Sequence, residues 1–520
     1  MKNLPSFLLL LMTITWPAVT DAQQNTFNKV IDYSPGGIAV FDMSLAWDDG
    51  FLLAGNDATG HNAVVIKMDI SGNPQWNKGY HFSEYGNSLR AVTQTFDSNY
   101  VTVGTIPDPV NSIQQSVCMK LDKNGEVLWS KMLSGVTKSF VALNVIQTAD
   151  SSLFVTGTTT VNYTIPTGIF AAYLDQEGNL LWSREYTCVD RSLYPASAKQ
   201  TADGGILITG FDNRSPSPPF GAFLLKLNPD GLITWFNHYA LTSAKENFGV
   251  DVVLSNDQIL LITIHGVTKV DTTGSVVWSK LYQNLYFDFI FDTPLPKVKV
   301  LSNGDFIIVK GDFFLSNYLL RFDSAANLLT ARALVLSPAS IMETKNKEII
   351  IAGNGPLVGV KSGLGYNPHI GLIQTDSILS EGDCITEMSV YPSADTMVAS
   401  PIFATMTEAG LLTDVIPVIS HLNLIIRNGC VDIIGSVAEH PKQPELFIYP
   451  NPVKSILTVE SKQPLREADI SLYDARMRLV LQHRMEQTIE ELDVSHLPSG
   501  IYYLKVVSGL GSGVMKVIKE

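Results

Sequence analysis

Four cysteines, few charged residues and short hydrophobic runs limit what this 520-residue chain can be. Charged residues make up only 17% of the chain and the net charge is −14, so it has no basic stripe to bind nucleic acid or an anionic membrane. Beyond the N-terminal segment, no apolar stretch reaches the roughly 20 residues needed to span a bilayer. The sequence therefore predicts neither a nucleic-acid partner nor a transmembrane span.

Catalytic and metal-binding motifs are also missing. The nine histidines show no His-Glu-x-x-His or His-x-His spacing, and no Cys-x-x-Cys, Gly-x-Ser-x-Gly elbow or phosphate loop occurs. We therefore expect no cofactor and no metal site. Carboxylates brought together from distant segments would escape such a search, so an enzyme is not excluded.

The strongest positive feature is a tryptophan repeat. Five tryptophans close copies of a motif close to Leu-Asp-x-x-Gly-x-x-x-Trp, the first four spaced by 53 residues and the last by 43: Trp76, Trp129, Trp182, Trp235 and Trp278. Decayed copies at Asp323 and Asp376 bring the number to seven. A fixed period near fifty residues indicates one supersecondary unit copied along the chain.

Each copy divides into four short strands. In the clearest copy these strands, which are rich in β-branched and aromatic residues, are predicted at 89–95, 100–104, 117–121 and 127–132. Helix signals are nearly absent. Four antiparallel strands in each of seven copies predict an all-β fold, a seven-bladed β-propeller over residues 23–383. Residues 27–33 resemble the Trp strand that the seventh copy lacks, so we expect them to close the last blade.

The repeated Asp, Gly and Trp are expected to serve the fold. Asp and Gly make a tight turn between the third and fourth strands, and Trp packs at the rim where blades fan apart. The Asp-box of sialidases lies at the same place, but its Asp-x-Gly-x-Thr-Trp spacing differs. A sialidase also needs an arginine cluster, and the six arginines between residues 23 and 383 share no repeated offset.

Loops at which the repeat changes length are where we expect a ligand. The loops from second to third strands and from fourth to next first strands share one face of a propeller. Residues 282–292 lengthen one inter-blade link and carry five aromatic residues and two carboxylates. Sugar stacking on these rings is one interpretation, and ordinary strand and loop packing is the other. The candidate ligand-face residues are Tyr282, Tyr286, Phe287 and Asp288.

Residues 384–440 are expected to form an accessory β segment and a linker. Strand patterns at 387–391 and 422–427 suggest a hairpin or a small sheet against the propeller. Cys384 and Cys430 bracket the segment. A disulfide between them would staple it, although the sequence equally allows two free thiols. Cys118 and Cys188 fall in different blades and are expected to be free.

The N-terminal 22 residues have the pattern of a secretory signal peptide. Lys2 precedes an apolar run from Phe7 to Trp16, and small residues end at Ala22, where we expect cleavage. No cysteine lies nearby, which disfavours a lipoprotein anchor. The mature chain is therefore expected to be exported.

The C-terminal residues 446–520 form a compact module with the strand and turn pattern of a small β-sandwich. Three motifs resemble the C-terminal sorting domain of the type IX secretion system of Bacteroidetes. They are the opening Tyr449-Pro450-Asn451-Pro452, a strand with Gly500, Tyr502 and Leu504, and a basic end with Lys516 and Lys519. The usual Asp-x-x-Gly turn departs from the family pattern and ends in Met477.

That resemblance implies a route and a class of function. The Sec signal takes the chain to the periplasm, the type IX translocon takes it across the outer membrane, and a sorting peptidase cuts in or near residues 438–446. The cargo is then released or attached to the cell surface. We expect a non-catalytic module that binds a glycan or protein ligand. The alternative is a secreted glycan-active hydrolase or lyase, which requires two carboxylates about 5 to 10 Å apart on the loop face.

Overall fold

The computed structural model divides the chain into two compact units, Met1–Asp432 and Ile433–Glu520. It describes residues 27–428 and 446–520 apart from short gaps at 34–36, 85, 109–112, 136–137, 162–164, 215–219, 244–245, 256–257, 284–295, 311–316, 335, 355–368, 381–384, 389, 394–395, 402, 410, 423, 462–467, 475–478, 486 and 509–510. The described residues contain strands and turns and no helix, and hence no helix that could cross a membrane.

Seven antiparallel sheets form the first unit, which confirms the predicted seven-bladed propeller. The strands of blades 1 to 3, from inner to outer, are β2 (Ile38–Leu45), β3 (Phe51–Asp57), β4 (Ala63–Met68) and β5 (Pro74–His81); β6 (Ser88–Gln94), β7 (Tyr100–Asp108), β8 (Ile113–Leu121) and β9 (Val127–Ser134); β10 (Ser139–Gln147), β11 (Leu153–Val161), β12 (Ile165–Leu174) and β13 (Leu180–Thr187). Blades 4 and 5 are β14 (Arg191–Gln200), β15 (Ile206–Arg214), β16 (Gly221–Leu227) and β17 (Ile233–Leu241); β18 (Gly249–Ser255), β19 (Gln258–Thr263), β20 (Gly266–Val270) and β21 (Val276–Gln283). Blades 6 and 7 are β22 (Lys297–Val300), β23 (Phe306–Lys310), β24 (Tyr318–Phe322) and β25 (Leu328–Leu334); β26 (Ser337–Glu343), β27 (Ile349–Asn354), β28 (Ile370–Thr375) and β1 (Asn28–Tyr33).

The middle strands are apolar on both faces because each blade is packed between two others. In β4 and β16, every residue is buried. The fourth strands at the rim are less buried, and β9 and β13 each have only two buried residues among eight. This difference is why second- and third-strand positions read as continuous apolar runs.

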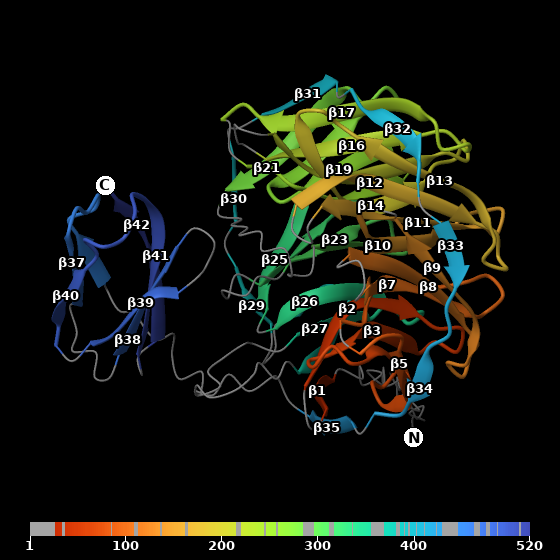
Figure 1. Cartoon of the computed structure of the whole chain (residues 1–520), viewed down its shortest axis with the longest axis horizontal. Helices are drawn as coiled ribbons and strands as arrows, with labels where there is room; N and C mark the ends of the chain where they lie inside the picture. Colours follow the sequence, from red (N-terminus) through yellow and green to blue (C-terminus); the bar gives the residue numbers. More distant parts are fainter. Residues whose placement is uncertain are drawn as a thin grey trace, which may run out of the picture. The chain divides into compact units, whose positions relative to one another are not determined.

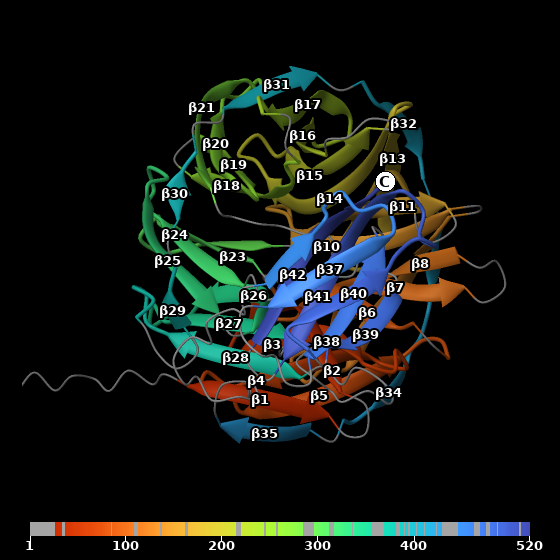
Figure 2. The ribbon, with the colours of Figure 1, turned by 90° about the vertical axis from the view of Figure 1, so that its left-hand side faces the viewer.

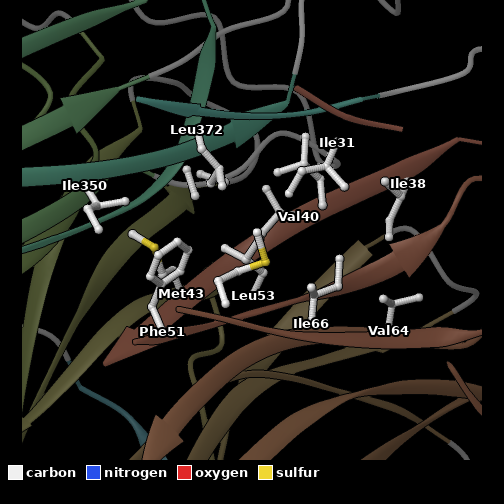
Figure 3. Packing of buried hydrophobic residues seen from close by; sticks show 14 of the residues in the cluster. Ile31, Ile38, Val40, Met43, Phe51, Leu53, Val64, Ile66, Ile350 and Leu372 are labelled. Atoms are coloured by element: carbon white, nitrogen blue, oxygen red, sulfur yellow. The ribbon is translucent and has the colours of Figure 1, made fainter. Parts of the chain in front are cut away.

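The N-terminal strand closes the ring. β1 pairs with β28, so the last blade combines the first strand of the chain with three strands from its far end. Figure 2 shows β28, β1 and β35 side by side. A buried cluster joins blade 7 to blade 1 and includes Ile31, Val40, Phe51 and Leu372 (Figure 3). The two ends of the propeller are thus held by strand pairing and by a shared core.

The repeated Gly and Trp meet across blade boundaries. Gly125 in one Asp-x-x-Gly turn has a φ of +78°, and a Cβ there would lie 2.8 Å from the ring of Trp76 in the preceding blade. The Trp76 indole N–H donates to the carbonyl of Lys123 in the same turn (3.1 Å). The contact recurs at Gly178 with Trp129, Gly231 with Trp182 and Gly274 with Trp235. The motif therefore joins neighbouring blades, and Phe27 takes the place of Trp against Gly72.

A segment that follows the propeller runs around its rim and adds a fifth strand to every blade (Figure 1). We call residues 385–428 the belt. Its strands, in chain order, pair with blades 6, 5, 4, 3, 2, 1 and 7: β29 (Ile385–Glu387), β30 (Tyr391–Pro392), β31 (Met397–Pro401), β32 (Thr405–Glu408), β33 (Leu411–Asp414), β34 (Val418–Ser420) and β35 (Leu424–Asn428). The expected hairpin or small sheet is therefore wrong, because the belt strands pair with seven blades and not with one another.

The belt also covers the spaces between blades. Each of the seven propeller core clusters contains at least one belt side chain, and four of these are buried: Ile385, Met397, Ala409 and Leu422. Asn77, one residue after Trp76, accepts the N–H of Leu422 (2.7 Å). A belt strand thus pairs with the outer edge of each blade, where backbone donors and acceptors would otherwise lack a partner strand.

The second unit has two antiparallel sheets around one core. The first contains β36 (Leu446–Tyr449), β37 (Ile456–Ser461) and β40 (Ile489–Asp493). The second contains β39 (Leu479–Met485), β38 (Ala468–Asp474), β41 (Gly500–Ser508) and β42 (Gly511–Lys519). Their inner faces bury a cluster that includes Leu457, Ile470 and Leu504. This is the small β-sandwich expected from the sequence.

Candidate recognition sites

Tyr282 is the one candidate ligand-face residue within the described part of the chain. Its ring centroid lies 5.8 Å from that of Phe322 in the next blade, and burial raises its pKa above the ordinary value. This is the inter-blade packing that the sequence allowed as its second interpretation. Tyr286, Phe287 and Asp288 lie outside the described residues, so their role on the ligand face stays a prediction.

The position of Tyr282 belongs to a repeated feature that the sequence reasoning missed. Three other tyrosines also stand four residues after a repeat tryptophan, and their hydroxyls donate to a turn carbonyl of the next blade: Tyr80 to Gly125 (2.8 Å), Tyr186 to Gly231 (2.7 Å) and Tyr239 to Gly274 (2.6 Å). Burial raises the pKa of Tyr80 well above the usual range. The common offset from Trp was the signal that would have revealed this role.

A charged cluster lies under the loop face of blade 4. Asp212 in β15 is almost fully buried, with 1% of its side chain exposed, and accepts an ion pair from Arg191 at the start of β14. His238 in β17 places Nδ1 2.9 Å from Asp212 Oδ1. The imidazole lies where a Cβ of Gly221 would be, 1.9 Å from Cε1, so glycine is required there. We call Arg191, Asp212 and His238 the blade-4 cluster.

Blade 3 carries a second polar set at the same three repeat positions. Lys138, Thr159 and Glu185 correspond to Arg191, Asp212 and His238 by strand register and by offset from Trp. Lys138 Nζ lies 2.7 Å from Glu185 Oε1, and Thr159 donates to the same oxygen at 2.7 Å. Neighbouring blades therefore present different charged groups in one geometry, while strands beneath them keep the same register.

The blade-4 cluster has a defined chemical capacity. Arg191 and Asp212 compensate each other's charge, and Asp212 orients the imidazole by holding Nδ1. With Nδ1 held by Asp212, Nε2 is the second nitrogen of an imidazole whose side chain is 15% exposed. Burial raises the pKa of the nearby Cys188 thiol to about 11, so this cysteine is a thiol at neutral pH and a poor nucleophile.

Among the described residues there is no candidate metal site, and the two cysteines are free. Among the residues described, no group of three or more His, Cys, Asp or Glu side chains is arranged to hold a metal ion. Cys118 is buried and Cys188 half-buried, and both are free. Cys384 and Cys430 lie outside the described residues, as does Ala22 at the expected signal cleavage site.

Residues of the sorting motifs make hydrogen bonds that connect segments of the second unit. Asn451 ties the opening motif to the last strand, because its Nδ2 donates to the Lys516 carbonyl (2.8 Å) and its Oδ1 accepts the Ile518 N–H (2.8 Å). The Tyr449 hydroxyl donates to Glu460 (2.9 Å) and that of Tyr502 to the Pro498 carbonyl (2.8 Å).

The remaining sorting residues divide between core and surface. Leu504 and Tyr502 are in the core, and Lys519 is 8% exposed. Pro450, Pro452, Gly500 and Lys516 are exposed. The opening motif and the basic end, which are far apart in sequence, therefore meet along β42.

Comparison with known proteins identifies the second unit. Residues 447–520 match the family model described as "Secretion system C-terminal sorting domain". A search of curated proteins returned no match.

The solved structures that this chain matches are distant in sequence. A Bacteroides caccae protein of unknown function is 13% identical, with 58% of this chain and 98% of that chain covered and a TM-score of 0.33. PorZ, a surface component of the type IX secretion system of Porphyromonas gingivalis, is 9% identical, with 92% and 81% covered and a TM-score of 0.23. Prolyl oligopeptidase B of Galerina marginata is 10% identical, with 83% and 55% covered and a TM-score of 0.38. The protein thus combines a seven-bladed β-propeller with a type IX C-terminal sorting domain that directs it across the outer membrane.

Proposed function

We propose that the propeller is a non-catalytic binding module whose ligand contacts the loop face at blades 3 and 4. The observation that carries this proposal is the blade-4 cluster, in which the buried Asp212 contacts both Arg191 and Nδ1 of His238. Burying a charged residue costs free energy unless the residue is paired, and Arg191 and His238 supply that pairing to Asp212. Its neighbour in blade 3 offers Lys138 and Glu185 in the same register.

The state of the buried carboxylates favours binding over glycan hydrolysis. A glycosidase needs a general acid whose pKa is raised, next to a second carboxylate. On the loop face, Asp212 faces Arg191 and His238, Glu185 faces Lys138, and Asp57 accepts the N–H of His61 (3.0 Å).

A glycan and protein binding array probed with the mature cargo tests this proposal. His238→Ala and Gly221→Ala, which displaces the imidazole, are expected to weaken binding of any ligand found by about tenfold, as for the loss of one hydrogen bond to a buried or charged group. Lys345→Ala is the matched control, because Lys345 lies in a first-to-second-strand turn on the opposite face with 71% of its side chain exposed.

Two outcomes would contradict the proposal. If the His238→Ala, Gly221→Ala and control variants bound the ligand equally well, the ligand would not contact the blade-4 cluster. Turnover of a polysaccharide panel by the mature cargo would show that the propeller is a glycan-active hydrolase or lyase and not a non-catalytic binding module.

We also propose the processing steps that the sorting domain implies. Signal peptidase cuts after Ala22, and the type IX translocon and its sorting peptidase release the second unit by a cut in or near residues 438–446. Intact mass and terminal sequencing of the protein recovered from the cell surface and medium test both cuts. A mature protein that begins elsewhere, or keeps residues 447–520, would contradict this assignment.

A further inference from the structure

The three-stranded sheet of the second unit has an outer face that its strand register defines. β37 is the central strand, with β36 on one side and β40 on the other. More and less buried residues alternate along β37 and β40, so every second side chain points away from the core. Eight side chains lie on this outer face, which we call the acidic face: Phe447, Tyr449, Ile456, Thr458, Glu460, Ile489, Glu491 and Asp493.

The side chains of the acidic face stand in rows across the three strands. One row is Phe447, Glu460 and Ile489, the next is Tyr449, Thr458 and Glu491, and the third is Ile456 and Asp493. The Tyr449 hydroxyl donates to Glu460 (2.9 Å) and so joins the first two rows. From the spacing of strands and of alternate residues, the face measures about 10 by 14 Å.

Four large apolar or aromatic side chains on the acidic face are exposed to solvent. Their exposed fractions lie between 40% and 47%, and they are Phe447, Tyr449, Ile456 and Ile489. Because the rows are neighbours, these side chains and the carboxylates between them make one continuous patch. A contiguous exposed apolar patch with polar groups around it marks an interaction site on a soluble protein.

The charge on this patch has one sign. Its three charged residues are Glu460, Glu491 and Asp493, and none of the eight residues is basic. The outward positions of the four-stranded sheet differ, since they include Lys505 and Lys516. A partner that fits the acidic face therefore presents Lys or Arg beside aliphatic side chains, because like charges would repel it.

Tyr449 connects the acidic face with sorting. It opens the motif in which Asn451 bonds to the last strand and thereby serves the fold. The Tyr449 ring, in contrast, lies outside the core cluster of the second unit, on its surface. We infer that the acidic face is where a basic and aliphatic surface of the type IX export machinery docks on the sorting domain. The inference rests on the export that the sorting domain directs and is independent of any ligand of the propeller.

The size of the acidic face suits a transient contact. A stable protein complex buries about 800 Å² on each partner, which is several times the area of a face of about 10 by 14 Å. Cargo has to leave the translocon once it has crossed the outer membrane. Opposite charges bring the two surfaces together quickly, and a small contact lets them separate again.

Matched charge reversals test the sign of the partner. Glu491→Lys alters the acidic face, and Asp469→Lys makes the same change at an exposed, outward position of the four-stranded sheet. Immunoblots of periplasm, cell surface and medium give the exported share of the full chain. Glu491→Lys is expected to lower that share about fivefold, because an exposed ion pair is replaced by a repulsive one. Asp469→Lys is expected to leave it unchanged.

A second matched pair tests the apolar part of the contact. Ile489→Ser removes an exposed side chain from the acidic face, and Ile501→Ser removes one of similar exposure from the other sheet. Only Ile489→Ser is expected to reduce export, while urea unfolding of all four variants stays that of the unchanged chain. Equal export of the four variants would overturn the docking face. Retention of the unchanged chain in the periplasm would overturn the export route as well.

Site-specific cross-linking gives a result that does not depend on a destabilising variant. A photo-reactive amino acid replaces Thr458 at the centre of the acidic face, or Ser471 in β38 as the control, in cells that export the full chain. Position 458 is expected to form an adduct with a type IX component, on a peptide that contains Lys or Arg, and position 471 is not. An adduct of position 458 with the propeller, an adduct from position 471 alone, or no adduct would overturn the inference.

Discussion

The contact between turn glycines and tryptophans predicts that two substitutions with the same backbone cost will have different effects. Gly125 and Gly204 both have a φ of +78°, and both lie in tight hairpin turns. A Cβ at Gly125 would lie 2.8 Å from two atoms of the Trp76 ring, whereas the nearest atom to a Cβ at Gly204 is Pro229 Cγ at 3.6 Å. Alanine at either site adopts the left-handed region, which costs about 1–2 kcal/mol. Only Gly125→Ala must also displace an indole.

The expected magnitudes follow from these distances. Gly204→Ala should lower the free energy of unfolding by about 1 kcal/mol, because a more restricted unfolded chain offsets part of the strain. Gly125→Ala should lower it by about 2–4 kcal/mol, since overpacking a filled site costs about 1–3 kcal/mol more. Repeating the pair in a Trp76→Leu background, where the ring is gone, should remove most of the difference.

Equilibrium urea unfolding of the mature cargo, followed by tryptophan fluorescence and circular dichroism together, measures these values. Gly178→Ala serves as a replicate, because its Cβ would lie 2.9 Å from Trp129. Equal losses for Gly125→Ala and Gly204→Ala, or a difference that persists without Trp76, would refute the idea that the motif joins blades through this contact.

Three further predictions concern other contacts. Tyr80→Phe should cost about 1–2 kcal/mol in urea unfolding, because it leaves the buried Gly125 carbonyl without its donor; Tyr173→Phe, whose hydroxyl bond to Asp150 is exposed, should cost less than half as much. The Lys226 ammonium and the Thr201 hydroxyl hold the pKa of Asp203 at about 2, below its unfolded value near 4; its contribution is therefore full above pH 4 and disappears as the pH falls to 2, so Asp203→Asn should lower stability at pH 7 and flatten the acid loss measured between pH 5 and 2. Asn451→Ala should remove both hydrogen bonds to the last strand and reduce the amount of protein exported, measured by immunoblot of periplasm and medium, whereas Lys454→Ala, at an exposed site, should export normally.

The number and order of blades could be predicted from sequence because they follow from local spacing. A tight turn with Asp and Gly at fixed offsets, and strands of regular length between turns, repeat at each copy whatever the rest of the chain does. The N-terminal strand was recognised by its likeness to the Trp strand. The sorting domain was recognised for a similar reason, since its motifs are contiguous.

Contacts between residues that are distant in sequence could not be predicted in the same way. Asp212 and His238 lie 26 residues apart in sequence, and Arg191 lies 21 residues before Asp212. They meet because three strands of one blade place equivalent positions side by side and because Gly221 leaves room for the imidazole. Comparing the same three offsets between blades would have singled them out as candidates, but their contact depends on the sheet.

By itself the sequence determined the repeat, the all-β class, the seven blades and the sorting domain, since each of these rests on spacing within a few tens of residues. Only the tertiary structure decided the path of the belt and the role of the turn glycines. The belt strands are two to five residues long and too short to carry an apolar period of their own. They become strands because each finds an unpaired blade edge, and the order of those edges exists only after the ring has formed.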